Sequence, residues 1–126
     1  MEDKSKFLPD PSAFMKRLEE DFPVTIAGGR RPLVVHVVRQ FLPNRGGLED
    51  VVYNLCRQGL ARGYRIRVVT LDSLFSAPGT ALAEREIIDG IEIVRIGWRG
   101  SSRYPIAPSV LKHIGDADLL HVHAVD

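Results

Sequence analysis

Two histidines near the end of the sequence are its first candidates for chemistry. His121 and His123 are separated by one residue, Val122, in an apolar run. In a β-strand both imidazoles would therefore lie on one face. A zinc site needs at least a third protein ligand; Asp126 could offer a carboxylate, but no cysteine or further histidine stands near in the sequence. We therefore expect no metal at this place. The favoured interpretation is one histidine packed in the interior and the other facing a ligand.

A glycine pair, Gly46-Gly47, is the second candidate. It follows a continuous apolar run, Leu33 to Val38, and precedes a helical apolar pattern that continues to Leu60. A helix N-terminus presents unpaired N–H groups, and glycines let that backbone approach a phosphate closely. A mere tight turn is the alternative, because the G-x-G-x-x-G and Walker patterns are absent. Glu49 and Asp50 in the first helical turn would weaken a purely electrostatic anion site.

The third candidate is the polar segment 97–108, which carries Arg99 and Arg103 beside the aromatic residues Trp98 and Tyr104. Guanidinium groups form strong, directional hydrogen bonds with phosphates, so this segment could bind a phosphate or sugar hydroxyls. A solvated surface loop fits the same residues equally well. The sequence shows no spacing typical of a Ser-His-Asp triad and no pair of catalytic carboxylates.

A βαβ unit is expected to position the glycine pair. Residues 33–39 show no polar alternation, which is typical of a central parallel strand covered on both faces. Residues 48–61 carry apolar side chains at helical spacing, and 65–71 follow as a second strand. The two strands are expected to be parallel neighbours joined by a right-handed crossover. His36 lies within the first strand, where a hydrogen-bonded core histidine is favoured over a ligand contact.

The later segments extend the predicted sheet. Residues 86–96 contain two β-branched runs about Asp89-Gly90, a dipeptide typical of tight hairpin turns. A short helix is expected at 108–114 and a strand at 118–123. The alternation of strands and helices predicts an α/β fold: a Rossmann-like three-layer sandwich with a mainly parallel sheet.

The chain is expected to divide into two parts. Residues 1–32 are interpreted as an N-terminal extension with a short amphipathic helix, and 33–126 as a partial Rossmann-like domain. A parallel strand needs cover on both faces, and little sequence follows the last predicted strand. We therefore expect a truncated N-terminal piece of a longer protein. Cover by a partner chain is the alternative.

The composition narrows the class of protein. Among 126 residues, 44% are hydrophobic and 26% charged, and the formal net charge is +1, so nothing favours a nucleic acid partner. The single cysteine, Cys56, fits a reducing compartment and a buried, inert thiol. The charged N-terminus leads into no apolar stretch typical of a secretory signal. A cytoplasmic protein is expected, with peripheral membrane contact left open.

Taken together, these segments resemble the N-terminal, acceptor-side half of the GT-B glycosyltransferases of the family-4 type (group 1). The matching stretches follow one another in that family's order: Val34–Glu49, Leu55–Gly63, Arg65–Thr70, Asp89–Arg95 and Asp118–His123. The resemblance implies a retaining enzyme with its active site between two Rossmann-like halves. Such an enzyme transfers a hexosyl unit from a nucleotide-diphosphate sugar to a glycan or lipid-linked acceptor, as in polysaccharide biosynthesis.

The resemblance also implies roles for single residues. Gly46 and Gly47 would approach the phosphate and sugar of the donor, and His123 would be the catalytic-site residue that hydrogen-bonds to the transferred sugar. Arg103, with Tyr104 beside it, would bind the acceptor. No metal or other cofactor is implied. The C-terminal half, which holds the nucleotide sugar, is missing, so this chain alone is expected to be inactive. Peripheral association with the inner face of a membrane stays open.

Two other interpretations stay open on the sequence. The chain could be a truncated or degenerate relative without catalysis, acting as a binding or interaction module. It could also be another nucleotide-binding α/β protein, such as an epimerase. Those proteins normally carry a G-x-x-G-x-x-G loop after the first strand, and this chain does not.

Overall fold

The computed structural model describes Lys16 and residues 31–77, 79–101 and 105–123, and its main feature is one mixed β-sheet. Five strands lie in the order β3-β4-β2-β1-β7. The four parallel strands are β1 (Leu33–Val37), β2 (Arg65–Leu71), β4 (Ile91–Ile96) and β7 (Leu119–Val122). The edge strand β3 (Arg85–Ile88) is antiparallel to β4. The sheet is therefore mainly parallel, as predicted.

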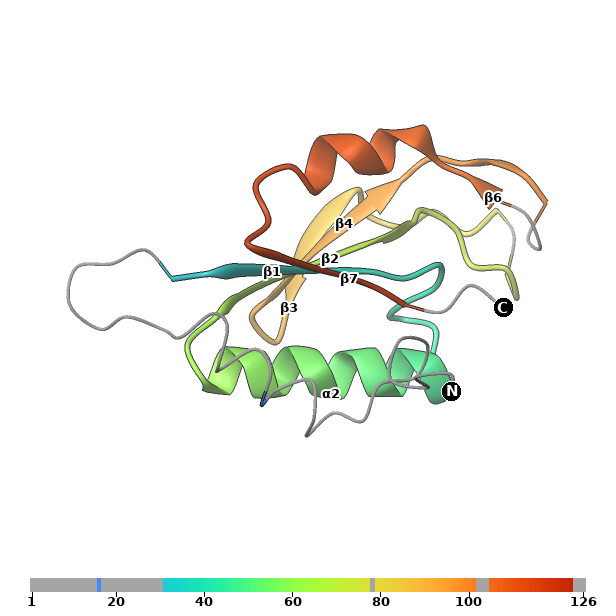
Figure 1. Ribbon diagram of the computed structural model, residues 1–126. Helices are drawn as coiled ribbons and strands as arrows, with labels where there is room; N and C mark the ends of the chain where they lie inside the picture. The colour runs from blue at the N-terminus through green and yellow to red at the C-terminus, as the bar shows by residue number, and fades with distance from the viewer. Residues whose placement is uncertain (1–15, 17–30, 78, 102–104, 124–126) are drawn as a thin grey trace, which may run out of the picture.

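Helices on both faces make this sheet the middle of three layers (Figure 1). The α-helix α2 (Gly47–Ala61) covers one face, and the 3₁₀ helix η2 (Pro108–His113) lies over the other. The α/β, Rossmann-like prediction is confirmed. The predicted amphipathic helix of the N-terminal extension lies in residues 1–15 and 17–30, outside the described residues. Among the helices that the structure describes, none combines the length and the apolar character needed to cross a membrane.

Strand β1 lies at the centre because its side chains are apolar on both sides. Val34 joins the cluster under α2, while Leu33 and Val35 join the cluster under η2, and all three are fully buried. β1 pairs with β2 on one side and with β7 on the other. The strand ends at Val37, two residues before the predicted end. Beyond that end, the Arg39 backbone carbonyl accepts hydrogen bonds from the Leu71 amide and the Thr70 hydroxyl, both of β2.

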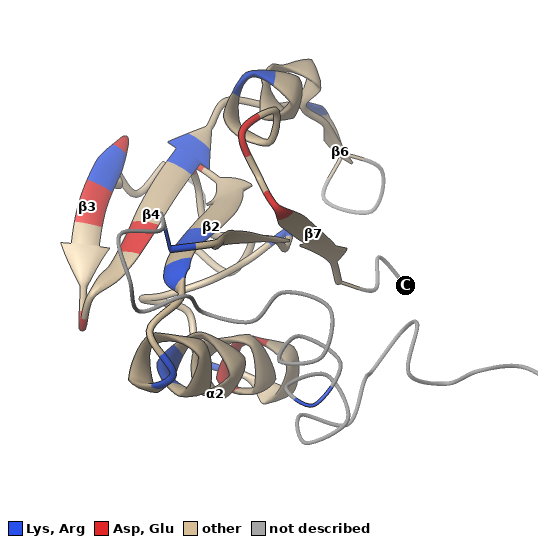
Figure 2. Cartoon of the chain, turned by 60° about the vertical axis from the view of Figure 1, so that its left-hand side comes forward, with Lys and Arg blue, Asp and Glu red and all other residues tan. Residues whose placement is uncertain are grey.

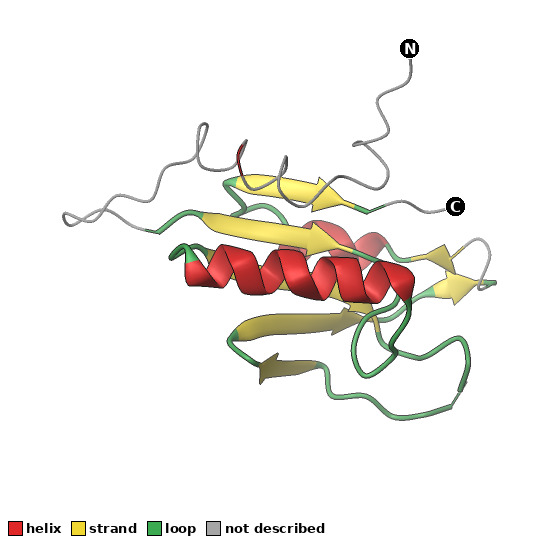
Figure 3. Cartoon of the chain, turned by 90° about the horizontal axis from the view of Figure 1, so that it is seen from below, coloured by secondary structure: helices red, strands yellow, loops and turns green. Residues whose placement is uncertain are grey.

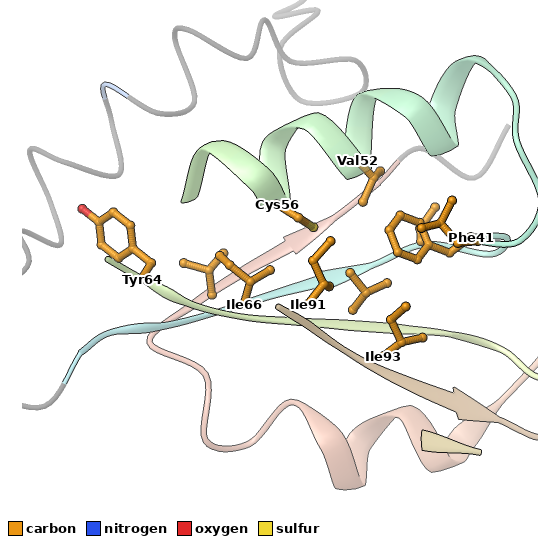
Figure 4. Close-up of a cluster of buried hydrophobic side chains, with 11 residues drawn as sticks. Phe41, Val52, Cys56, Tyr64, Ile66, Ile91 and Ile93 are labelled. Atoms are coloured by element: carbon orange, nitrogen blue, oxygen red, sulfur yellow. The ribbon is translucent and has the colours of Figure 1, made fainter. Parts of the chain in front are cut away.

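The core under α2 is built from one face of the helix and the sheet below it. Figure 4 shows Val52 and Cys56 pointing from the helix towards Phe41, Ile66 and Ile93. The predicted burial of Cys56 is confirmed, and this burial raises the pKa of its thiol. α2 begins at Gly47, one residue before the prediction. Gly63, with φ 94°, follows its end in the left-handed conformation that glycine adopts most easily.

The hairpin β3–β4 forms at the predicted turn. Asp89 and Gly90 have φ values of 53° and 85°, as a two-residue hairpin turn with both residues in the left-handed region requires. Figure 2 shows acidic and basic residues side by side on both strands of this hairpin. Glu92 accepts from Arg67 of the next strand at 2.8 Å and from Arg85 at 3.2 Å. Opposite charges therefore meet across neighbouring strands of the sheet.

The segment between β4 and β7 differs most from the prediction. The expected loop contains a small hairpin of β5 (Arg99–Gly100) and β6 (Pro105–Ile106). The expected short helix at 108–114 is the 3₁₀ helix η2, which has a proline near its start and six residues. Its inward residues Val110 and Ile114 still pack on the sheet.

Candidate active site at the carboxyl edge of the sheet

The histidine pair lies where the sequence placed it, at the end of β7. His121 and His123 lie on the face of the sheet covered by α2, the side on which Leu119 packs against the core. Their ring centroids are 4.0 Å apart. His121 is half-buried, and His123 is 2% exposed. The residue expected to contact the sugar is thus the more buried of the two.

His36 completes a cluster of three imidazoles. Its strand β1 lies directly beside β7, and the register sets His36 opposite His121. Its Nδ1 atom is 3.0 Å from Nε2 of His123, a hydrogen-bond distance, and the ring is fully buried. The prediction of a hydrogen-bonded core histidine is confirmed. Its partner is a site residue 87 positions away, which no local pattern in the sequence could reveal.

All three imidazoles are held neutral by their surroundings. Burial lowers the pKa of His36 well below the ordinary value of 6.5, and repulsion from the other two rings lowers it further. Burial lowers the pKa of His121 to about 4. Burial, followed by repulsion from His121, lowers the pKa of His123 to about 3. Near pH 7 the cluster therefore consists of uncharged hydrogen-bonding groups.

The same three side chains form a set of nitrogen ligands. Their available ring nitrogens all lie within 4.8 Å of one another. Three neutral imidazoles are a ligand set that suits zinc. The third ligand that the sequence did not supply near His121 thus comes from the neighbouring strand. The hydrogen bond between His36 and His123 already engages one nitrogen of each ring without a metal.

The glycine pair stands at the same edge of the sheet. Figure 3 shows the first turn of α2 and the end of β7 at the same side of the molecule. Gly46 is the N-cap, in extended conformation, and as a glycine it has no side chain to cap the helix. Among the described residues, a Cβ added at Gly47 would meet no atom within 4 Å, whereas one at Gly46 would meet Glu49 Oε1 at 3.0 Å. The backbone at Gly47 is therefore open to a ligand.

Nearby side chains bind the two carboxylates of the first helical turn. Asn44 donates a short hydrogen bond to the Glu49 carboxylate, and Arg45 forms an ion pair with Asp50 at 3.1 Å. The exposed ion pair with Arg45 offsets the negative charge of Asp50, one of the two charges expected to weaken an anion site here. The free N–H groups of the helix start remain the main feature available to a phosphate.

An open pocket of about 490 Å³ lies at the carboxyl ends of the parallel strands. Its lining is mostly apolar: Val37, Val38, Arg39, Val69, Thr70, Leu71, Ile96, Pro105, Ile106, Ala107, Val110, Val122 and His123. Among the predicted site residues, His123 lines this pocket and the glycine pair does not. Arg103 and Tyr104 lie outside the described residues, but the next residues, Pro105 and Ile106, are part of the lining.

Comparisons with known proteins give three close relatives of one kind. Each is a GDP-mannose:cellobiosyl-diphosphopolyprenol alpha-mannosyltransferase. The protein from Komagataeibacter xylinus is 53% identical over 94 residues, or 74% of this chain and 24% of that protein. The proteins from Xanthomonas campestris and Xanthomonas oryzae are 54% and 52% identical over the same length, 74% of this chain and 25% of each.

The chain spans about a quarter of the length of the curated relatives it matches. No family model matches it. No solved structure matches it significantly. Its α/β fold fits these relatives, and the sequence identity shows that the chain is homologous to a part of the group 1 glycosyltransferases.

Proposed function

We propose that this chain is the acceptor-side part of a retaining GT-B glycosyltransferase that transfers mannose from GDP-mannose to a lipid-linked acceptor. The observation that carries the proposal is identity of 53% over 74% of the chain with a mannosyltransferase of that name. A second Rossmann-like half, supplied by a longer protein, would hold the nucleotide sugar. Because a polyprenol chain is apolar, we place the reaction at the surface of a membrane.

The geometry supports a division of roles along the carboxyl edge. In open α/β sheets ligands bind outside the carboxyl ends of the strands, where Gly47 and His123 both stand. We assign the backbone of Gly46 and Gly47 to the diphosphate and sugar of the donor. The neutral ring of His123 hydrogen-bonds to a sugar hydroxyl, which burial favours because the uncharged imidazole can both donate and accept.

We place the acceptor beside the 490 Å³ pocket. Its wall includes Pro105 and Ile106, which directly follow the predicted acceptor-binding residues Arg103 and Tyr104. The apolar lining would contact the part of the hydrophobic acceptor chain that lies next to its diphosphate. Arg103 would neutralise the phosphate charge. Arg39 contributes a second cation to the same wall.

The first test is transfer by the longer protein that contains this chain. With a cellobiosyl-diphosphopolyprenol acceptor, labelled GDP-mannose is expected to give product, while UDP-glucose and UDP-N-acetylglucosamine give none. Chelation by EDTA is expected to leave the rate unchanged, since no metal takes part. Activity lost with EDTA and restored by zinc would instead assign the three histidines to a metal. Absence of transfer from every donor would favour the non-catalytic binding module.

Replacing Gly47 by alanine tests the donor-binding backbone. The added methyl group meets no protein atom, so the free energy of unfolding should stay the same or rise slightly, as glycine-to-alanine changes in helices do. If the diphosphate lies against this backbone, the methyl group displaces it, and transfer should fall about tenfold or more.

Gly115→Ala is the matched control for this prediction. Its added Cβ also meets nothing within 4 Å, but Gly115 lies before β7, at the opposite edge of the sheet. Transfer by this variant should equal that of the unchanged protein. Equal rates in both alanine variants would remove Gly47 from the donor site.

A further inference from the structure

The buried contact between His36 and His123 constrains both rings at once. The two nitrogens that meet, His36 Nδ1 and His123 Nε2, are 3.0 Å apart, and the residues are 0% and 2% exposed. One hydrogen bond between two ring nitrogens requires one N–H and one lone pair. Because both rings are neutral near pH 7, each carries only one N–H.

Proton counting then couples the two tautomers. If Nδ1 of His36 donates, Nε2 of His123 accepts, and the proton of His123 must reside on its Nδ1. If Nε2 of His123 donates, Nδ1 of His36 accepts, and both rings carry their proton on Nε2. The two histidines therefore have the same tautomer, both Nδ1–H or both Nε2–H, and opposite tautomers would break the bond.

The second nitrogen of His123 is the atom left for a ligand. Its Nδ1 is buried and has no hydrogen-bond partner within the part of the chain that the structure describes. A buried polar atom of this kind is normally paired. His123 stands at the end of β7 and lines the open pocket at the carboxyl edge. Whether its Nδ1 donates or accepts depends on the tautomer that it shares with His36.

We propose that His36 is a positioning residue, which fixes the tautomer and ring orientation of His123 so that Nδ1 of His123 presents one defined hydrogen-bonding group to a ligand. That the ligand is the sugar of a nucleotide-sugar donor rests on the proposed function. The coupling of the two rings does not rest on it. His36 lies within β1 at the centre of the sheet, a rigid support for such a contact.

Two substitutions of His36 separate positioning from packing. The amide oxygen and nitrogen of asparagine are bonded to Cγ, as Nδ1 is in histidine. His36→Asn therefore keeps a polar atom within reach of His123 Nε2. Leucine has a similar volume but no polar atom, so His36→Leu removes the hydrogen bond and keeps the packing. Circular dichroism and urea unfolding establish that both variants fold.

Nitrogen-15 NMR of the imidazoles, on this chain at pH 7, tests the coupling directly. Unchanged protein should show His36 and His123 in one and the same tautomer. His123 should keep one tautomer in His36→Asn and become a mixture in His36→Leu. Opposite tautomers in the unchanged protein, or a His123 spectrum that His36→Leu leaves unchanged, would overturn the proposal. So would added zinc that shifts all three rings, since the cluster would then be a metal site.

Transfer by the longer protein tests the consequence. His36→Leu should lower kcat about tenfold to a hundredfold, because a misplaced hydrogen-bonding group costs that much. His36→Asn should keep most of the kcat of the unchanged protein. Equal rates for the two variants would overturn positioning. If the unchanged longer protein transfers no sugar, the proposed function fails, and the NMR result still decides whether the two rings are coupled.

Discussion

Replacement of Arg95 by methionine is expected to lower the free energy of unfolding by about 3 kcal/mol. The side chain of Arg95 is 1% exposed and joins three separate backbone segments. Its guanidinium donates to the carbonyl of Leu42 at 2.9 Å and to that of Ala83 at 2.8 Å, and it forms an ion pair with Glu86. Methionine fills most of the space but leaves both carbonyls without this donor.

The Leu42 contact gives this change a local consequence as well. Leu42 belongs to the loop that leads from β1 to the glycine pair, so Arg95 attaches that loop to β4. Arg85→Met is the control, because it removes an arginine of the same hairpin that is 55% exposed and paired with Glu92. Its cost should stay below about 1 kcal/mol. Urea unfolding of the two variants gives the comparison, and equal losses would show that Arg95 contributes no more than a surface ion pair.

Acid should destabilise the protein well above the range in which carboxylates titrate. Each of the three clustered histidines has a pKa in the folded protein below its unfolded value of about 6.5. The unfolded chain therefore binds more protons, and stability is lost as the pH falls from about 6.5 towards 4. Between pH 7.5 and pH 5 the loss should be up to about 2 kcal/mol for each of His36 and His123, and less for the half-buried, partly solvated His121.

Urea unfolding at several pH values between 5 and 7.5 measures this slope. His123→Gln should reduce the dependence of the free energy of unfolding on pH by about the contribution of one histidine, whatever its effect on stability at pH 7.5. A slope that His123→Gln leaves unchanged would show that this histidine is not a source of the acid sensitivity.

The sequence predicted the central elements closely because each has a strong local cause. The aliphatic run at β1, the apolar stripe of α2 and Gly63 after its end fixed these elements to within two residues. Asp89-Gly90 marked its turn because few other dipeptides adopt two positive φ values. The small hairpin of β5 and β6 was missed, since two-residue strands carry no periodicity.

The candidate site was predicted only where its residues are close in sequence. His121 and His123 form a visible pattern, as do Gly46 and Gly47. His36 could not be assigned to the cluster, because its position beside His121 depends on the placement of β7 next to β1. That strand order is decided by packing across 85 or more residues, which a local pattern does not record. The roles of all these residues in transfer stay predictions until they are tested.

The contact between the starts of β1 and β7 determines where the chain should tolerate insertions. The amide of Leu33 donates to the Asp118 carboxylate at 2.7 Å, and the amide of Asp118 donates back to the Leu33 carbonyl at 2.9 Å. One residue added between Asp118 and His121 would turn the imidazoles of His121 and His123 to the opposite face, since side chains alternate along extended backbone. One residue added before η2 leaves that count intact. Insertions between β4 and η2 should therefore keep the register of the two histidines, whereas an insertion in the three-residue step from Asp118 to His121 should not.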